Sequence, residues 1–159
     1  MDDRFLALLS RVPLAQPGAE LARSLRAAQA HGLALSQAQL ERLERSRLQD
    51  LRATGRVEFG GGILPKLLVC FCSSPYLSSG CEADLARLQT LFYQFKGECG
   101  EHLTDDELLS AMRLIFDQAA RGDLEFLAAA RREDLYRAAR TGSLAGTAFE
   151  EEALYDWEE

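Results

Sequence analysis

The amino-acid sequence predicts an all-α protein: a single compact bundle of about five to seven helices around a buried apolar central helix. The chain contains 28 Leu and 23 Ala, but only 5 Ile and Val together and 5 Thr. Leu and Ala lose little conformational freedom in a helix, whereas β-branched side chains favour strands. The 159 residues are enough for one ordinary domain. We therefore expect a single helical domain over residues 1–145 and an acidic, flexible C-terminal tail over residues 146–159.

The composition excludes several classes of protein. Hydrophobic residues make up 47% and charged residues 27% of the chain, with a net charge of −7. This charge disfavours binding to nucleic acid or to anionic lipid. No apolar run approaches the roughly 18 residues of a membrane-spanning helix, and Met1–Leu6 lacks the basic start of a signal peptide. We expect a cytoplasmic protein, with no membrane and no nucleic-acid partner, in which the cysteines remain thiols.

Two helices are expected before residue 33. A short one covers residues 4–11. The next begins at Pro17-Gly18 and ends at His31-Gly32, because a histidine in the last turn and a glycine just after it are common stop signals. This segment carries Leu21 and Leu25 on one face.

The following helix is predicted to begin at the N-cap Ser36, to run to about Thr54 and to end at Gly55. Its apolar face is expected to consist of Leu40, Leu43, Leu48 and Leu51. Four arginines fall within about 80° on the opposite side of the helix: Arg42, Arg45, Arg52 and Arg56. The sequence thus predicts an amphipathic helix with a strongly basic outer face.

A triple glycine, Gly60-Gly61-Gly62, must form a loop because glycine is unfavourable inside either regular element. The next ten residues, Ile63–Cys72, are apolar nearly all round. They predict the central, buried helix, with Pro65 in its first turn, where a missing backbone N–H costs little.

The second half of the chain carries clear helix signals. Residues 82–96 show an apolar stripe at helical spacing, and Gly97 is expected to end this helix. Thr104–Glu107 forms a T-x-x-E capping box directly before another apolar stripe. Asp123 is a suitable cap for a further helix, and the helical pattern continues over residues 135–140.

Part of the chain resembles a known family. The segment Arg56–Leu77, together with Phe92–Lys96 and Leu103–Leu109, is similar to a family of small bacterial proteins classed as a domain of unknown function. The resemblance covers the middle and later parts of the chain. It implies a self-contained bacterial domain and brings no activity, cofactor or partner with it.

The best-defined candidate ligand site is an anion site around the glycine loop. It consists of Arg56, Gly60, Gly61, Gly62 and Lys66. Free backbone N–H groups at a helix start, glycines that admit an anion and two nearby cations are the ingredients of a phosphate or carboxylate site. The sequence contains neither the G-K-[ST] of a Walker loop nor G-x-G-x-x-G in a βαβ unit. A simple turn that needs positive φ is therefore the competing interpretation.

Cysteine and histidine offer soft metal ligands at Cys70, Cys72, Cys81, Cys99 and His102. The spacing does not fit a structural zinc site, which needs close pairs such as C-x2-C in both halves. Cys70 and Cys72 would also point about 200° apart on a helix. We expect buried thiols, and neither a metal site nor a cofactor.

No residue is predicted to be catalytic. The only imidazoles are His31, at a helix end, and His102, in a loop, and no local signature links either one to a nucleophile. The pair Asp105-Asp106 suits the N-terminus of a helix better than acid-base chemistry. Catalytic groups can converge from distant parts of a chain, so an enzyme is left open.

Two functional hypotheses follow. The first, which we favour, is a non-catalytic protein-interaction or accessory module, in which the basic stripe of Arg42, Arg45 and Arg52 and the acidic aromatic tail engage a protein partner or a second copy. Residues 1–56 carry 9 basic and 6 acidic side chains, and the rest of the chain carries 9 and 19, so the charge is asymmetric. Nucleic-acid binding would favour aromatic residues between the arginines, and the stripe contains none. The alternative is a binder of, or enzyme acting on, a phosphate- or carboxylate-bearing small molecule at the glycine loop.

Overall fold

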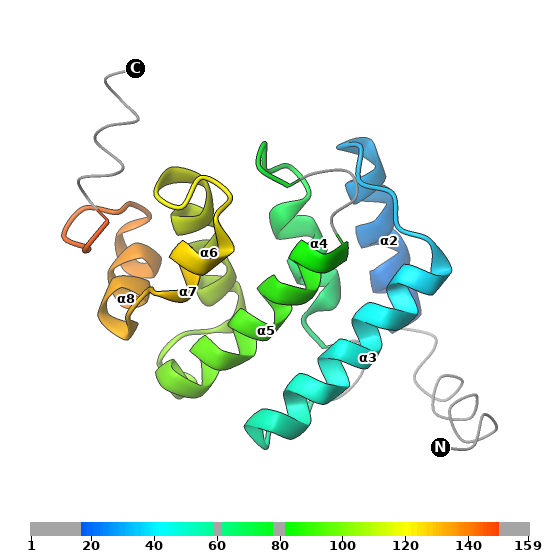
Figure 1. The fold of residues 1–159 in the computed structure, drawn as a ribbon, viewed down its shortest axis with the longest axis horizontal. Coiled ribbons are helices and arrows are strands. Elements are labelled where there is room, and N and C mark those ends of the chain that lie inside the picture. Colours follow the sequence, from blue (N-terminus) through cyan, green and yellow to red (C-terminus); the bar gives the residue numbers. More distant parts are fainter. Residues whose placement is uncertain (1–16, 59–61, 78–81, 150–159) are drawn as a thin grey trace.

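The computed structural model describes residues 17–58, 62–77 and 82–149, which form seven α-helices, one 3-10 turn and no strand (Figure 1). The elements in chain order are α2 (Pro17–Ala30), α3 (Gln37–Thr54), α4 (Leu64–Phe71), α5 (Glu82–Cys99), η1 (Gly100–His102), α6 (Asp105–Gln118), α7 (Leu124–Ala128) and α8 (Arg132–Thr141). The all-α prediction is confirmed. The predicted helix over residues 4–11 lies outside the described residues.

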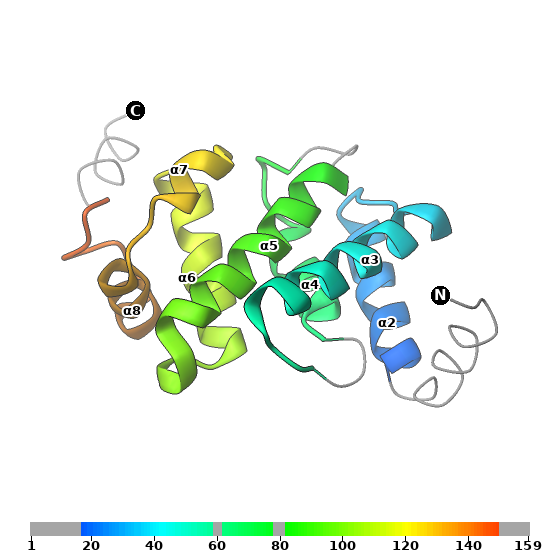
Figure 2. The same cartoon turned by 60° about the horizontal axis from the view of Figure 1, so that its bottom comes forward.

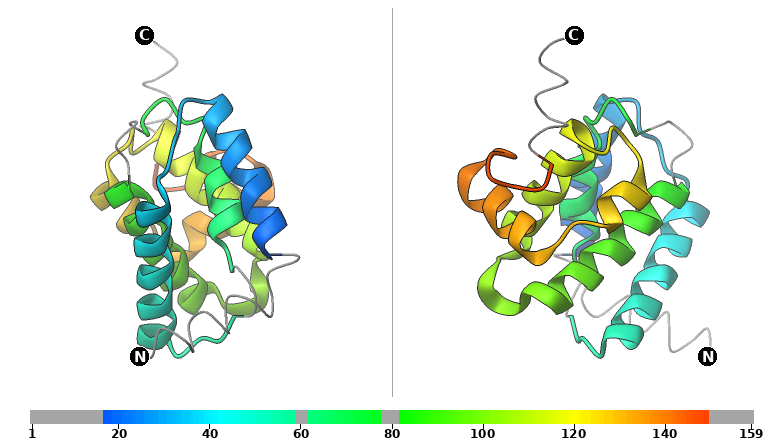
Figure 3. Two further views of the ribbon diagram at one scale, coloured as in Figure 1. Left: turned by 90° about the vertical axis from the view of Figure 1, so that its right-hand side faces the viewer. Right: turned by 60° about the vertical axis from the view of Figure 1, so that its left-hand side comes forward.

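Helix α5 is the element that touches most of the others. It packs along α3 and also contacts α4, α6, α7 and α8, while α2 packs on α4 and α6 packs on α8. Two views show α2 and α3 at one end of the long axis and α7 and α8 at the other (Figures 1 and 2). Seen along the long axis and in an oblique view, the helices form one bundle (Figure 3).

The core is built mainly from leucine and aromatic side chains of α4, α5 and α6. Phe71, Phe92, Phe95 and Phe116 are almost completely buried, and the rings of Phe71 and Phe116 meet edge to face, with centroids 5.5 Å apart. Such ring pairs add to the free energy that burial itself provides. The three helices therefore carry most of the hydrophobic stabilisation of the domain.

Helix α4 is buried on one side only. Leu64, Leu67 and Leu68 are inaccessible to solvent, but the side chain of Val69 is 51% exposed and Lys66 is exposed as well. Pro65 lies in the first turn, as expected. The sequence predicted that this apolar segment would be the central helix of the bundle. In the structure, α4 and the longer helix α5 both lie at its centre.

The helix starts follow the sequence closely. Ser36 and Thr104 both form complete capping boxes, in which the hydroxyl accepts from the backbone N–H three residues on and the side chain there accepts from the cap. Gly55, with φ of 66°, ends α3 in the left-handed conformation. Each of these caps satisfies backbone groups that the helix leaves without partners.

The predicted end of α5 at Gly97 is wrong. The helix runs through Gly97 to Cys99, and Gly100 follows with φ of 61°. A glycine inside a helix costs about 1 kcal/mol. Lys96 and Cys99, on either side of it, are both buried, and the contacts of this extra turn outweigh the cost.

The predicted apolar face of α3 also needs a correction. Leu40, Leu43 and Leu51 are buried, but the side chain of Leu48 is 42% exposed, while Arg47 is only 5% exposed. On a helix, Arg47 lies midway between Leu43 and Leu51, whereas Leu48 lies about 60° away from Leu51. Because α3 packs mainly along α5, its buried strip is narrow and Leu48 falls outside it.

The last described residues pack on the bundle. Thr147 and Phe149 are buried, and the Phe149 ring lies 5.3 Å from that of Phe126 on α7. Residues 150–159 lie outside the described part, and the division at residue 145 stays a prediction. None of the described helices has the length and apolar character that crossing a bilayer requires.

Candidate functional site

A buried polar cluster joins the end of α3 to α5. Arg47 Nη1 donates to Glu58 Oε1 at 3.2 Å, and the Tyr93 hydroxyl donates to the same oxygen at 2.5 Å. Arg47 also bonds Glu44 through Nε at 3.3 Å and Nη2 at 3.1 Å. The side chains of Arg47 and Glu58 are only 6% and 10% exposed. We name Arg47, Glu58 and Tyr93 the Glu58 cluster.

The protonation of this cluster suits a structural role. Burial raises the pKa of the Tyr93 hydroxyl well above its usual value, and the hydrogen bond to the Glu58 carboxylate raises it further. Burial acts to lower the pKa of Arg47, but the Glu44 carboxylate and other partners outweigh it, so this pKa is raised overall. Tyr93 thus remains a neutral donor and Arg47 a cation at physiological pH. Neither is available as a general base.

The structure brings two residues of the predicted anion site to this cluster. Arg56 Nε lies 3.9 Å from Glu58 Oε2. At Gly62, where φ is 63°, an added Cβ would overlap both Arg47 Nη1 and Glu58 Oε1. Gly60 and Gly61 lie outside the described residues. The negative group beside Arg56 and Gly62 is therefore one of the protein's own carboxylates.

Lys66 has other surroundings. Its Nζ lies 3.4 Å from Asp106 Oδ1 on α6, and its side chain is 44% exposed. It lines a hollow of about 420 Å³ together with the acidic residues Glu20 and Asp106. No contact among the described residues links Lys66 to Arg56 or Gly62. The acidic groups near this cation are those of Glu20 and Asp106, so Lys66 does not share a ligand position with the other two residues.

The basic stripe of α3 divides into two kinds of arginine. Arg42 forms a two-pronged ion pair with Glu82 at the start of α5, with distances of 2.8 and 2.7 Å. Arg45 and Arg52 are exposed, and neither guanidinium forms a hydrogen bond or ion pair with the described residues. The half-exposed Leu48 lies between them in sequence, and Val57, just after the helix, is 76% exposed. We name Arg45, Leu48 and Arg52 the outer face of α3.

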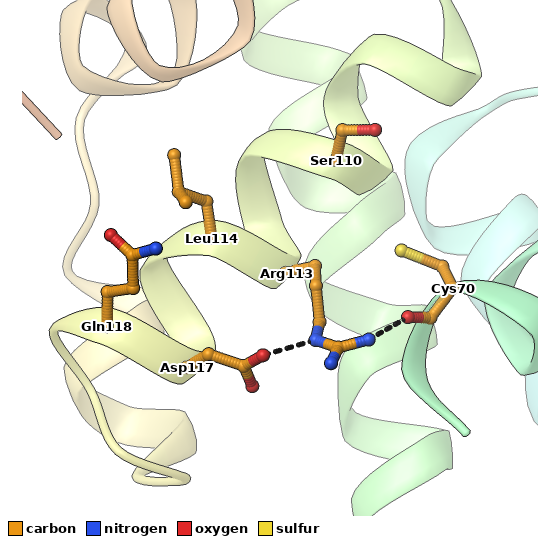
Figure 4. A pocket seen from close by; sticks show the side chains of 6 residues that line it. All are labelled: Cys70, Ser110, Arg113, Leu114, Asp117 and Gln118. Carbon is orange, nitrogen blue, oxygen red and sulfur yellow. Dashed lines mark hydrogen bonds and ion pairs between the residues drawn. The ribbon is translucent and has the colours of Figure 1, made fainter. Parts of the chain in front are cut away.

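A shallow hollow of about 270 Å³ lies beside the end of α4 (Figure 4). Arg113 dominates it: Nε donates to Asp117 Oδ2 at 2.5 Å, and Nη1 donates to the Cys70 carbonyl oxygen and to Ser73 Oγ at 3.1 Å. The Ser74 hydroxyl donates to the other Asp117 oxygen at 2.7 Å. A cation on the last carbonyls of a helix is a common way to end it. This network therefore caps α4.

The Cys70 thiol borders the same hollow but is poorly suited to nucleophilic chemistry. Burial raises its pKa to about 11, although Arg113 acts in the opposite direction, so the thiol is protonated at neutral pH. His31 and His102 are both exposed, and the His102 ring packs edge-on against Tyr136. Within residues 17–58, 62–77 and 82–149, no three His, Cys, Asp or Glu side chains are grouped to hold a metal ion; Cys81 lies outside these ranges.

Sequence reasoning missed three buried polar residues that organise these sites: Arg47, Tyr93 and Lys96. Lys96 is 3% exposed and donates to the Leu103 carbonyl at 2.5 Å while pairing with Asp105 at 3.1 Å. A signal for Arg47 was present, because it occupies the middle of the i, i+4, i+8 series that begins at Leu43. Lys96 similarly follows Phe92 by four residues on the buried stripe of α5. A charged residue at an apolar position of a helical pattern thus indicates a buried charge that needs a partner.

The close approach at Gly62 gives a first prediction. Gly62→Ala should destabilise the protein more than Gly55→Ala, because both positions have positive φ but only an alanine at 62 would displace Arg47 and Glu58. We expect about 1 kcal/mol at Gly55 from backbone strain alone and at least twice that at Gly62. Urea unfolding of the two variants measures the difference. Equal losses of stability would show that Arg47 and Glu58 can move away from the added methyl group without a loss of free energy.

The environment of Cys70 gives a second prediction. In a variant that keeps only this cysteine, alkylation by iodoacetamide at pH 8 should be about 100-fold slower than for a thiol of pKa near 9, because the thiolate population is smaller by that factor. The rate should continue to rise with pH toward about 11. Mass spectrometry across a pH series measures it, with the urea-unfolded chain as control. A rate that levels off near pH 9 in the folded protein would contradict this description.

Comparison with known proteins places the chain in a family. A family model described as "Family of unknown function (DUF6323)" matches residues 20–145, which is most of the chain and nearly all of its described helices. No curated protein and no solved structure matches it. The resemblance noted in the sequence is thus confirmed as membership of a domain of unknown function, and the chain belongs to the family DUF6323.

Proposed function

We propose that this domain is a non-catalytic protein-interaction module that binds an acidic, partly apolar segment through the outer face of α3. One observation carries the proposal: Arg45 and Arg52 are exposed and form no hydrogen bond or ion pair with the described residues, while an exposed leucine lies between them. Exposed arginines beside an apolar side chain are typical of the residues that anchor protein interfaces.

The geometry of the face suits an extended or helical segment. Arg45, Leu48 and Arg52 are related as i, i+3 and i+7, so they lie within about 60° around the helix. The two arginines are separated by about 10 Å along the axis. A matching partner would present two carboxylates at that spacing with an apolar side chain between them. Charge complementarity of this kind speeds association and sets the register of the partner.

The other arginine of the predicted stripe has a different role. Arg42 is held by Glu82 in a two-pronged ion pair, which joins the start of α3 to the start of α5. It is an additional link between α5 and the helix that presents the face. We therefore limit the docking surface to the three residues of the outer face and leave Arg42 out of it.

The state of the polar groups elsewhere supports a binding role over catalysis. Arg47 and Arg113 make structural contacts with carboxylates and carbonyls, and the Cys70 thiol is protonated at neutral pH. Catalysis generally requires a nucleophile or base whose pKa is near the working pH. The outer face of α3, in contrast, needs only the exposed charges and the apolar side chain that it already has.

The test is site-specific photo-crosslinking in cells. A photoreactive residue at position 48 should give crosslinked products with an acidic partner segment, and these should disappear when Arg45 and Arg52 are both changed to Glu. The matched control is Arg23→Glu with Arg26→Glu on α2, which makes the same charge change at two other exposed arginines. All these positions are exposed, so unfolding temperatures should change little.

A second crosslinker at the exposed Glu133 on α8 sets the background. If position 48 gives no more product than position 133, the outer face of α3 is not a docking surface. Products that survive the Arg45 and Arg52 charge reversal would likewise contradict the proposal, because they would not depend on the two arginines.

The alternative, binding of a small anion at the glycine loop, is favoured by one specific feature: Arg56 Nε is buried and has no hydrogen-bond partner. The Glu58 carboxylate 3.9 Å away would have to share this group with a ligand. If the site exists, phosphate or a small carboxylate should raise the unfolding temperature, and Arg56→Ala should abolish the effect. An anion at about 100 times its Kd adds about 2.7 kcal/mol.

Lys66→Ala is the matched control for that measurement, since Lys66 pairs with Asp106 and has no described contact with Arg56. A shift that is lost in Arg56→Ala and kept in Lys66→Ala would place the ligand beside the Glu58 cluster. A flat response to every anion would remove the alternative.

A further inference from the structure

We propose that the segment bound by the outer face of α3 is Glu150–Glu159 of a second copy of this chain, so that copies associate head to tail. This inference rests on the proposed function and names the partner. It follows from three observations: the chemistry of the segment, the place where the described chain reaches it, and the position of α3 in the fold.

The chemistry of residues 150–159 complements the outer face. The sequence EEEALYDWEE contains six acidic residues and no basic one. Its apolar side chains, Leu154, Tyr155 and Trp157, lie between acidic groups on both sides. The outer face has the reverse pattern, with an exposed leucine between two arginines. When opposite charges flank the apolar groups on two surfaces, they attract the surfaces and also set the register in which the surfaces align.

The placement of the two ends favours a second copy over the same chain. The described chain ends at Phe149, which is buried and whose ring packs on Phe126 of α7. Helices α7 and α8 lie at the opposite end of the long axis from α3 (Figures 1 and 2), and neither makes more than isolated contacts with it. Phe149, the last described residue, is therefore held at the end of the molecule opposite α3.

The association that results has a defined symmetry. Each copy offers one acidic segment and one basic face, so the contact is between two different surfaces. In a linear series of copies, one end would carry an unoccupied basic face and the other end an unbound acidic segment. Such copies either close into a ring or continue as a linear series. The attraction is between exposed charges, so salt should weaken it.

A charge-swap experiment tests this on the full-length chain. The face variant carries Arg45→Glu and Arg52→Glu, and the segment variant carries Glu150→Arg, Glu151→Arg and Glu152→Arg. We expect the wild-type chain to gain mass with concentration at low salt in sedimentation experiments. Each variant alone should stay monomeric. Their mixture, and the chain carrying both sets of changes, should associate again because the charges match once more.

The control is the Arg23→Glu and Arg26→Glu chain, which should associate like the wild type. A wild-type chain that is monomeric at every concentration, or variants that associate as the wild type does, would overturn the inference. The fluorescence of Trp157, the only tryptophan in the chain, provides an independent readout. If it shifts in the face variant while the wild type remains monomeric, the segment binds its own chain, and the second copy is ruled out.

The two proposals can fail separately. A monomeric wild type whose position 48 still crosslinks to another acidic protein overturns the head-to-tail contact and leaves the interaction module standing. A monomeric wild type that gives no product at position 48 overturns both. Crosslinks from position 48 to residues 150–159, found between differently isotope-labelled copies, would support both.

Discussion

The carboxylate of Glu58 is the group on which the arrangement of the first half of the molecule depends. It accepts hydrogen bonds from Arg47 and from Tyr93, and so ties the segment after α3 to both α3 and α5. A buried arginine without a counter-charge would destabilise a protein by several kcal/mol. The helix can therefore turn Arg47 toward α5 only because Glu58 and Glu44 meet it there. That rotation is also what leaves Arg45, Leu48 and Arg52 on the outside.

The charge asymmetry of the sequence becomes a spatial one. The basic half of the chain supplies α2 and α3, which lie at one end of the long axis, while the acidic half supplies α6, α7 and α8 toward the other (Figure 2). The acids of the second half serve partly as local partners: Glu82 holds Arg42, Asp106 lies beside Lys66 and Asp117 holds Arg113. Arg45 and Arg52 on α3 are exposed and are left without such a carboxylate partner among the described residues. Their charges are therefore available to a group outside this domain.

The sequence predicted the local features of this fold well and the long-range ones poorly. The caps at Ser36 and Thr104 and the end at Gly55 depend on residues within one turn of each other, so they could be predicted from spacing alone. Gly97 was misjudged because tertiary contacts around Lys96 and Cys99 outweigh the local cost of a glycine. Arg56 and Gly62 both lie beside Glu58, whereas Lys66 pairs with Asp106 on α6. No local pattern indicates which neighbour each side of a short helix will contact. Arg47 occupies an apolar position of the helical pattern, but two of the partners that allow its burial, Glu58 and Tyr93, lie 11 and 46 positions away, so spacing within the helix does not reveal them.

The buried Lys96 has a consequence for how the chain orders. Its ammonium group joins the end of α5 to the Leu103 carbonyl, only seven residues further on, and to Asp105 at the start of α6. Contacts this close in sequence require little loop closure, so they form with a small entropic cost. The pairings of α3 with α5 and of α2 with α4 instead join segments separated by another helix. The junction of α5 and α6 is therefore held by contacts that are local in sequence, whereas the end of the molecule that carries the outer face of α3 depends on contacts of longer range.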